Sequence, residues 1–291
     1  MKINEIICGD ALEVLKTLPS ESIDCCITSP PYFNLRNYNV TGQIGLETTY
    51  QEFIEKLLSV FLEVKRILKK EGTCFINLGD SYASIGKTNG DIDKDDGMDI
   101  ERGRSRIKKG MYMEKCLFMI PERFAISMIE HGWILRNKLV WVKPNAMPES
   151  VQDRWKKAHE YIFFFVKSKK YYFDLDVIRI QHKEERYEGM PARMVKLNPL
   201  GGIPPDFFYI NANCSENDTI KEHHATYPRM LISSPLKAAC PVGGVVIDPF
   251  FGFGTTGLVA KKLGRNYIGI DLNPDYCKLA EQRLRITDPL F

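Results

Sequence analysis

The stretch that decides the fold is Val245-Val-Ile-Asp-Pro-Phe-Phe-Gly-Phe-Gly-Thr-Thr-Gly257. Its opening residues are apolar and β-branched, which is typical of a buried strand, and its glycines lead into a helical pattern that begins at Thr255. Glycines let the backbone turn tightly and approach a ligand closely at the positive end of a helix. A second apolar run ends at Asp271, a carboxylate placed to accept hydrogen bonds from ribose hydroxyls. This unit predicts a binding site for an adenosine-containing cofactor.

A glycine pattern of this kind is not specific by itself. The spacing of Gly252, Gly254 and Gly257 matches the fingerprint of a nucleotide-binding dehydrogenase as well as that of a methyltransferase. A dehydrogenase is therefore an alternative from a different class, and it predicts nicotinamide binding. An ordinary glycine-rich turn between a strand and a helix is the structural alternative. A second motif, far away in the sequence, separates these interpretations.

The second motif is Ile23-Asp-Cys-Cys-Ile-Thr-Ser-Pro-Pro-Tyr32, an apolar strand that ends in Ser-Pro-Pro-Tyr. Two consecutive prolines fix φ and remove two backbone donors, so we expect the carbonyl groups of Ser29 and Pro30 to point outward rigidly. Such carbonyls suit an amino group that donates hydrogen bonds, and Tyr32 offers a flat face on which a base can stack. A loop breaker after a strand explains the prolines but not the serine before them or the aromatic residue after them. A dehydrogenase leaves the whole motif unexplained.

Short apolar runs alternate along the chain with amphipathic helical stretches, the pattern of an α/β fold with a mostly parallel sheet and helices on both faces. We expect strands at residues 5–8, 23–28, 73–78, 135–142, 160–166, 245–248 and 267–270. We expect helices at residues 49–69, 121–131, 255–263 and 274–285. In the first of these helices the apolar residues recur at helical spacing, which predicts a face buried in the core.

The two motifs together resemble those of a known family. Thr28-Ser-Pro-Pro-Tyr32 resembles the catalytic motif of DNA methyltransferases that modify exocyclic amino groups, and Asp248–Gly257 resembles their cofactor motif. The catalytic motif comes first, as in the permuted beta class, whose members act on N4 of cytosine or N6 of adenine. Further matches are Cys8-Gly-Asp-Ala-Leu12, Trp141-Val-Lys-Pro-Asn-Ala-Met-Pro-Glu-Ser150 with Arg154 and His159-Glu-Tyr-Ile162, and His224-Ala-Thr-Tyr-Pro228. The resemblance implies the Rossmann-like class I methyltransferase fold with circularly permuted motif order, and S-adenosylmethionine as the cofactor.

The resemblance also assigns roles to individual residues. It implies a catalytic site made of Ser29, Pro30, Pro31 and Tyr32. It implies cofactor binding by Asp10, Ala11, Thr226, Asp248, Pro249, Phe250, Gly252, Gly254, Thr255, Thr256 and Asp271. The implied reaction moves a methyl group from the cofactor to the amino group of a base flipped out of the duplex, by orientation and electrostatic matching.

Ser29, the residue before the two prolines of the catalytic motif, favours cytosine as the accepting base. Serine at this position resembles the cytosine-N4 enzymes, whereas Asp or Asn there resembles the adenine-N6 enzymes. Methylation at C5 of cytosine needs a nucleophilic cysteine, which relatives carry in a Pro-Cys pair, and this chain has no such dipeptide. We therefore expect a site-specific cytosine-N4 DNA methyltransferase, with an adenine-N6 enzyme as the alternative. An RNA or protein-amide acceptor is a further alternative, which the extent of the resemblance to DNA enzymes disfavours.

Double-stranded DNA is the expected partner, and local clusters of cations are expected to bind it. The net charge of +3 is too small to attract a polyanion by itself. Residues 84–113 are rich in Gly, Asp, Lys and Arg and are expected to form a flexible basic loop that includes Arg104 and Arg106. A second basic group contains Lys143, Arg154 and Lys156.

The chain divides into one domain and one insert. Residues 176–222 mix Pro, Gly, Asn and charged residues with few apolar runs, and they form a candidate target-recognition insert. Residues 1–175 and 223–291 then make up the catalytic and cofactor-binding domain. By analogy with the family, we expect a restriction–modification system with a cognate restriction endonuclease as functional partner. A monomer and a homodimer both remain open.

Composition limits the remaining classes. The eight cysteines include no Cys-x-x-Cys pair, so we expect buried, reduced thiols and no metal site. No apolar segment is long enough to span a membrane, and the first residues do not resemble a signal peptide. The expected location is therefore the cytoplasm of a bacterium or archaeon, in association with the nucleoid.

Overall fold

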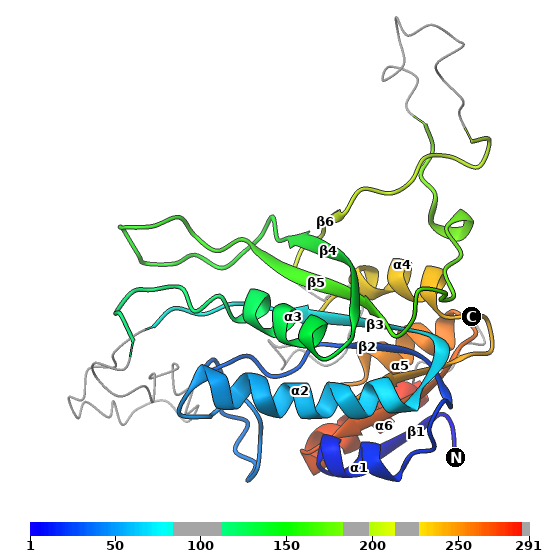
Figure 1. The fold of residues 1–291 in the computed structure, drawn as a ribbon, viewed down its shortest axis with the longest axis horizontal. Helices are drawn as coiled ribbons and strands as arrows, with labels where there is room; N and C mark the ends of the chain where they lie inside the picture. Colours follow the sequence, from blue (N-terminus) through cyan, green and yellow to red (C-terminus); the bar gives the residue numbers. More distant parts are fainter. Residues whose placement is uncertain (84–111, 183–197, 213–226, 287–291) are drawn as a thin grey trace, which may run out of the picture.

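Eight strands form one sheet in the order β1-β8-β7-β2-β3-β5-β4-β6 in the computed structural model, which describes residues 1–83, 112–182, 198–212 and 227–286 (Figure 1). The strands are β1 Glu5–Cys8, β2 Ile23–Thr28, β3 Leu68–Leu78, β4 Ile134–Val142, β5 His159–Val166, β6 Phe207–Tyr209, β7 Val245–Asp248 and β8 Asn266–Asp271. All neighbouring pairs from β1 to β3 are parallel, and only β5 runs antiparallel to its neighbours β3 and β4. The parallel strands bring their carboxyl ends to one edge, where ligands bind in sheets of this type.

The helices cover both faces of this sheet, as the sequence predicted. They are α1 Ala11–Thr17, α2 Tyr50–Ile67, α3 Ile120–Glu130, α4 Arg229–Ala239, α5 Thr255–Lys262 and α6 Pro274–Ile286, with a short 3-10 helix at Asp176–Ile178. Buried residues of α1, α2 and α3 belong to one hydrophobic cluster, and those of α4, α5 and α6 belong to the other (Figure 1). The expected Rossmann-like arrangement of a mostly parallel sheet between two helical layers is confirmed.

The side chains of strand β2 pack into both hydrophobic clusters. Its side chains alternate across the sheet, so Cys26 joins the cluster under α2 while Cys25 and Ile27 join the cluster under α4. The strand is buried from Ile23 to its last residue, Thr28, with one half-buried residue between them. A strand buried on both faces needs an almost continuous apolar run, which is what the sequence provides here.

Helix α2 has a well-defined start and a buried apolar face. A capping box at its start joins Thr49 and Glu52, which satisfies backbone N–H groups that have no partner within the helix. The predicted apolar stripe is buried, with Phe53, Leu57 and Phe61 fully inaccessible to solvent. The predicted core face is confirmed.

The boundary after α2 differs from the prediction. The helix ends at Ile67 rather than residue 69, and β3 begins at Leu68 rather than residue 73. Leu68 is fully buried and pairs with Ile23 of β2, so tertiary pairing extends the strand into a segment whose charged residues carry no strand signal.

Three elements besides the short 3-10 helix were not predicted. Helix α1 has seven residues, too few to show a repeating pattern, and α4 contains Pro235, which disfavours a helix when read locally. Strand β6 lies within the expected insert and pairs in parallel with β4 through Phe207–Tyr209. The described part of the insert therefore adds an edge strand to the main sheet.

Most described cysteines are interior side chains, as the sequence predicted. Seven are described, all of them free, and five of these are buried. Among the described residues, no His, Cys, Asp and Glu side chains gather in groups that could hold a metal ion. Within the same residues, no helix combines the length and the apolar character needed to cross a membrane.

The ring of Phe251 joins the glycine-rich turn to the sheet. A methyl group added at Gly269 of β8 would lie 2.4 Å from this ring, and one added at Gly257 of α5 would lie 2.8 Å from it. The ring also stacks on Tyr267, with 5.8 Å between centroids and 11° between planes. Gly257, in the motif, and Gly269, in the adjacent strand β8, thus make room for an aromatic side chain rather than for a ligand.

We expect Gly269→Ala to destabilise the fold by about 1–3 kcal/mol, because the added methyl group overlaps a ring that has no space to move. Chemical denaturation measures this as a lower free energy of unfolding. Gly202→Ala is the matched control, since a methyl group there would lie 3.6 Å or more from its neighbours. Equal stability of the two variants would contradict the tight packing of Phe251.

Candidate active site at the carboxyl ends of the strands

Two adjacent hollows open at the edge where the parallel strands end. They enclose about 830 and 690 Å³, counted out to their open mouths and so including open solvent. The first is lined by Asp10, Ala11, Ser29, Pro31, Tyr38, Val40, Gly42, Gln43, Ile44, Pro249, Phe250, Gly252, Phe253, Asp271, Leu272, Asn273 and Tyr276. The second is lined by Ser29, Pro30, Tyr32, Leu35, Arg36, Tyr38, Asn77, Trp141, Lys143, Glu160, Ala212 and Tyr227. Ser29 and Tyr38 belong to both, so the hollows meet at the end of β2.

The glycine-rich turn and β8 form one wall of the first hollow. Gly252 has a φ of 50°, a conformation that glycine adopts without strain, and its N–H donates to the Asp271 carboxylate at 2.7 Å. The other oxygen of Asp271 accepts from the N–H of Asn273 at 2.8 Å. Burial raises the pKa of the Asp271 carboxyl above its ordinary value, while these two backbone donors lower it. The carboxylate is thus held at the end of β8 by the glycine-rich turn and by a backbone N–H just after β8.

The opposite wall comes from the loop between β2 and α2, which the sequence analysis missed. Five residues of this loop line the first hollow: Tyr38, Val40, Gly42, Gln43 and Ile44. The loop is tied down by Glu47, a buried carboxylate that accepts from the N–H of Gly45 at 2.8 Å and pairs with Lys56 at 3.0 Å. No local pattern marks this wall, because its residues reach the hollow through the path of the loop rather than through a helical or strand repeat.

Asp248 lies beneath both hollows and is 1% exposed. One of its oxygens accepts from the Thr28 hydroxyl at 2.5 Å and from the N–H of Phe250 at 3.0 Å. The other accepts from the Thr256 hydroxyl at 2.5 Å and from the Tyr227 hydroxyl at 3.2 Å. Burial raises the pKa of the Asp248 carboxyl to about 6, against the opposing effect of these four donors. The carboxylate joins the end of β2, the glycine-rich turn and α5 at one point.

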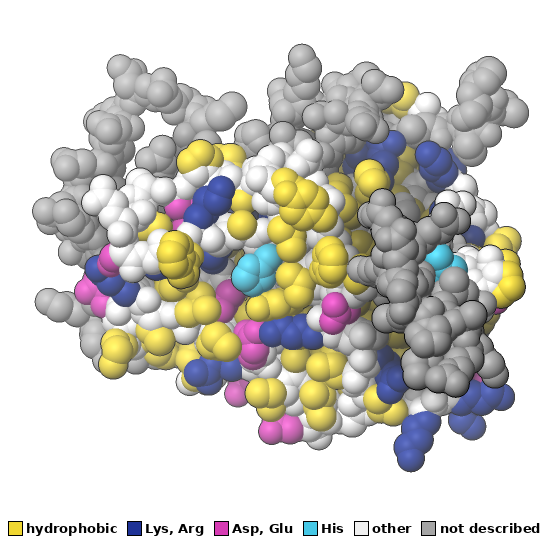
Figure 2. Space-filling model, turned by 90° about the horizontal axis from the view of Figure 1, so that it is seen from above, with side chains coloured by type: hydrophobic (Ala, Val, Ile, Leu, Met, Phe, Trp, Pro, Cys, Tyr) yellow, Lys and Arg dark blue, Asp and Glu magenta, His cyan; other side chains and the backbone are white. Residues whose placement is uncertain are grey.

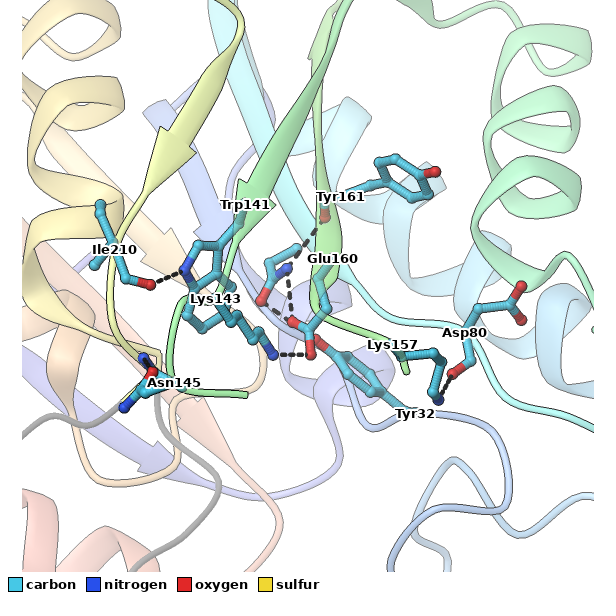
Figure 3. A network of polar contacts seen from close by, with 11 residues as sticks. Tyr32, Asp80, Trp141, Lys143, Asn145, Lys157, Glu160, Tyr161 and Ile210 are labelled. Carbon is cyan, nitrogen blue, oxygen red and sulfur yellow. Dashed lines mark hydrogen bonds and ion pairs between the residues drawn. The ribbon is translucent and has the colours of Figure 1, made fainter. Parts of the chain in front are cut away.

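The second hollow is built around Glu160, at the start of β5 (Figure 3). The Tyr32 hydroxyl donates to Glu160 Oε2 at 2.7 Å, and Asn77 Nδ2 donates to the same oxygen at 3.2 Å. The other oxygen, Oε1, forms an ion pair with Lys143 of the β4–β5 connection. The Lys143 ammonium also lies 4.2 Å from the ring centroid of Trp141. Side chains from three segments thus converge on one carboxylate.

These contacts fix the position of the Tyr32 ring. Its other support is Gly79, where an added methyl group would lie 2.6 Å from the ring, so the ring packs directly against the backbone that follows β3. Burial, followed by the nearby negative charge of Glu160, raises the pKa of the Tyr32 hydroxyl well above its ordinary value. Tyr32 therefore stays neutral and acts as a donor to Glu160.

The structure divides the residues that the sequence singled out into four groups. Lining the hollows are Ser29, Pro30, Pro31, Tyr32, Asp10, Ala11, Pro249, Phe250, Gly252, Asp271 and Lys143. Forming the buried support behind them, outside either lining, are Asp248, Gly254, Thr255 and Thr256, with Gly254 as the N-cap of α5. Arg154 and Lys156 lie on the β4–β5 connection, and Thr226, Arg104 and Arg106 lie outside the described residues.

Several residues of the second hollow were given no site role from the sequence, among them Glu160, Asn77 and Tyr227. Asn77 is the penultimate residue of β3, where a polar side chain breaks the apolar run and indicates a role at the strand end. Tyr227 donates to Asp248 and lies within the quoted stretch 224–228, but nothing in its spacing distinguishes it from the neighbouring residues. Ala212 comes from the far end of the insert and has no chemical signal.

On the face that Figure 2 shows, positive charge is dispersed. On the face seen from above, Lys and Arg side chains are scattered among acidic and hydrophobic ones, rather than forming one continuous field (Figure 2). This agrees with the small net charge of +3. A DNA-binding surface on the described part of the chain therefore depends on local groups of cations.

Comparison with known proteins identifies the family. The model of a family described as DNA methylase, of N6 and N4 methyltransferases, matches residues 23–282. The chain belongs to this family. The Type II methyltransferase M.Cfr9I of Citrobacter freundii is 39% identical over 96% of this chain and 87% of its own length. The corresponding values for M.XycI of Xanthomonas campestris pv. cyanopsidis are 41%, 95% and 86%.

Solved structures show the same fold. The PvuII DNA methyltransferase (cytosine-N4-specific) superposes with a TM-score of 0.70 at 23% identity, covering 100% of this chain and 89% of its own. A putative DNA modification methylase of Thermus thermophilus, complexed with S-adenosyl-L-methionine, has a TM-score of 0.64 at 24% identity, with coverages of 99% and 96%. This DNA methylase is therefore an S-adenosylmethionine-dependent DNA methyltransferase of the amino-modifying beta class, as the sequence predicted, and the dehydrogenase alternative is excluded.

The raised pKa of Asp248 predicts how the stability of the fold changes with pH. An exposed carboxyl has a pKa of 3.8 and Asp248 has one of about 6, so between these pH values the folded protein binds a proton that the unfolded chain has released. The contribution of this carboxyl to stability is present below pH 4 and is lost as the pH rises through about 6. The difference corresponds to about 3 kcal/mol.

We expect Asp248→Asn to flatten this part of the pH profile, because an amide keeps the shape of the side chain and has no proton to lose. Urea denaturation of the wild type and the variant between about pH 4 and pH 7 measures the free energy of unfolding. Asp275→Asn is the control, since that carboxylate is 78% exposed. Parallel profiles of the wild type and Asp248→Asn would contradict the raised pKa.

Proposed function

We propose that this DNA methyltransferase transfers the methyl group of S-adenosylmethionine to N4 of a cytosine flipped into the second hollow. The observation that carries the proposal is that Ser29 borders both hollows, one of which suits a cofactor and the other a planar base. A methyl donor and an acceptor amine must approach each other in line, so their sites have to meet at one wall.

The first hollow fits an adenosine-containing cofactor. Asp271 stands at the end of β8 with its carboxylate against the hollow, in the position from which a ribose is bound in related sheets. The aromatic rings of Tyr38, Phe253 and Tyr276 provide apolar walls for a purine. Asp10 caps α1 through one oxygen, which accepts from the N–H of Glu13 at 3.0 Å. When bound here, S-adenosylmethionine supplies an electrophilic methyl group.

The end of β2 prepares the amine for attack. The exocyclic amine of cytosine is a weak nucleophile because its lone pair is delocalised into the ring. Hydrogen bonds from this amine to the Ser29 hydroxyl and the Pro30 carbonyl favour a tetrahedral nitrogen with a localised lone pair. The two prolines fix the backbone, so the acceptors are positioned before the base arrives. No covalent bond to the protein is required.

The polar groups of the second hollow favour cytosine over adenine. Cytosine carries a carbonyl acceptor, O2, on the same edge of the ring as its amino group, whereas adenine has a C–H group at the corresponding position. Lys143 borders the hollow and has three N–H donors, one of which points to Glu160. A second donor can meet O2 of cytosine, while adenine would leave it without a partner. Tyr32, held at its hydroxyl by Glu160, offers its ring for stacking.

The remaining parts of the chain suggest how the target is chosen. Residues 176–222 act in this proposal as the target-recognition insert, and β6 fixes their described portion to the edge of the sheet beside β4. Ala212, at the end of that portion, borders the second hollow. Several relatives are named as Type II methyltransferases, which supports a role beside a cognate restriction endonuclease in the cytoplasm, where both DNA and cofactor are found.

The reaction product tests the proposal. We expect the purified protein to transfer the labelled methyl group of S-adenosylmethionine to unmethylated double-stranded DNA and to give N4-methylcytosine by nucleoside mass spectrometry. Mapping the modified positions then gives the recognition sequence. N6-methyladenine as the sole product would overturn the assignment of the base while leaving the family intact, and transfer to RNA or protein alone would overturn the DNA substrate.

A variant tests the role of Lys143. We expect Lys143→Met to lower kcat/KM for the cytosine substrate by about 10- to 100-fold, the loss typical of a hydrogen bond from a charged donor. Cofactor affinity should stay unchanged, because Lys143 borders only the second hollow. Lys138→Met is a matched control on β4, the strand that ends just before Lys143: Lys138 also pairs with a carboxylate, Glu122 at 2.5 Å, and also lies over a ring.

A double variant separates recognition of the base from simple charge balance. Lys143→Met leaves the Glu160 carboxylate without its ion pair, and adding Glu160→Gln removes that unpaired charge. If Lys143 binds the base, the double variant stays slow. Recovery of the wild-type rate would show that Lys143 serves only as a counter-ion for Glu160.

A further inference from the structure

The connection between β4 and β5 spans residues 143–158, far longer than the roughly 2–5 residues of an ordinary hairpin loop. Both of its ends border the second hollow, through Lys143 at its start and Glu160 just after its end. In Figure 1 it extends from β4 and β5 at the left, beyond the edge where the parallel strands end. Long connections at the rim of a site usually carry function.

This connection exposes a tryptophan. The side chain of Trp155 is 93% exposed, whereas the other two tryptophans of the chain, Trp133 and Trp141, are 2% and 3% exposed. Met147, on the same connection, is 82% exposed. An indole left in water forgoes the burial that stabilises most tryptophans, so the connection presents an apolar tip with no use in the fold itself.

The residues around Trp155 are held in place. Arg154 forms an ion pair with Glu149 at 2.6 Å, and Lys157 donates to the carbonyl oxygen of Asp80 at 2.8 Å (Figure 3). The N–H of Lys143 donates to the carbonyl oxygen of residue 158 at 2.7 Å and closes the base of the connection. Trp155 therefore projects from a braced support.

We propose that Trp155 is a wedge that enters the duplex beside the target base pair and fills the space left when the base turns into the second hollow. The inference rests on the proposed base flipping, and it adds the residue that makes the flipped state favourable. A flipped base leaves its neighbours without a stacking partner, and an indole restores that stacking. Apolar side chains inserted between base pairs are a general means of opening DNA.

The charges beside the tip match DNA as the partner. Besides Lys143 at its start, the basic side chains on or against the connection are Lys115, Arg154, Lys156 and Lys157, of which Lys115 reaches it through Asp153 at 2.5 Å. Cations below an apolar tip correspond to the arrangement of a duplex, in which phosphates flank the stacked bases. The connection begins and ends beside the hollow that receives the base, through Lys143 and Glu160, so one approach of the DNA serves both.

Duplexes with and without a base opposite the target test the wedge. We expect Trp155→Ala to lower kcat/KM at least about tenfold on a fully paired duplex that carries the mapped site, because opening the pair is then uncompensated. On the same duplex with an abasic position opposite the target base, the variant should match the wild type, since little stacking and no pairing must be lost. Trp155→Phe keeps an aromatic ring and should retain most of the activity on both duplexes.

Fluorescence gives a second, direct readout. Because the other two tryptophans are buried, the exposed-tryptophan emission of the wild type comes from Trp155, and binding of the paired duplex should quench it. Trp155→Ala should lack this change. Val242→Ala is the matched control for activity. Its side chain is 76% exposed and lies just before the amino end of β7, whereas the hollows lie at the carboxyl ends of the strands.

Several outcomes overturn the wedge. These are an equal loss by Trp155→Ala on both duplexes, unchanged activity on the paired duplex, or DNA binding that leaves the emission of Trp155 unaltered. A failure of the cytosine assignment is seen separately, in the wild-type product. If that product is N6-methyladenine, the same comparison is made with an unpaired adenine, and the result for Trp155 stands by itself.

Discussion

A buried carboxylate that receives four hydrogen bonds is the constraint on which the site depends. Asp248 is 1% exposed and joins Thr28 at the end of β2, Thr256 in α5, and Tyr227. An unpaired buried charge would be costly, so these donors have to stay in place for the fold to remain stable. The strand that leads into Ser29-Pro-Pro-Tyr32 and the glycine-rich turn after β7 are thereby fixed to each other. Their relative position is kept because one buried side chain cannot be left without partners.

A single carboxylate also organises the second hollow. Glu160 collects the Tyr32 hydroxyl, the Asn77 amide and the Lys143 ammonium, so a single carboxylate orients an aromatic face and a cation. Fixed polar groups stabilise a ligand without reorganising, which is the main way in which a site with no covalent chemistry accelerates a reaction. Support of this kind also explains why the hollow keeps its shape although its residues come from several separate segments.

The glycine-rich motif illustrates the difference between a pattern and its use. Glycine spacing is usually interpreted as room for a nucleotide, and Gly252 does line the first hollow. Gly257 and Gly269 instead make room for the ring of Phe251, which locks the turn onto β8. Glycines in such a motif can either line a binding surface or make room for a packed side chain. Only the packing around each glycine shows which of the two it does.

The sequence by itself determined the fold class, most of the strands, helix α2 and the two motifs, because these depend on local periodicity, on proline and glycine geometry, and on short contiguous stretches. It did not reveal α1, α4 or β6, nor that β3 starts at Leu68, since these depend on pairing and packing with distant segments. The same holds within the site. Asp248, Gly254, Thr255 and Thr256 support the hollows from behind, while the loop from Tyr38 to Ile44 forms a wall that no pattern indicated. Which side chains face a hollow depends on strand order and on the paths of loops, so it was decided by the tertiary structure alone.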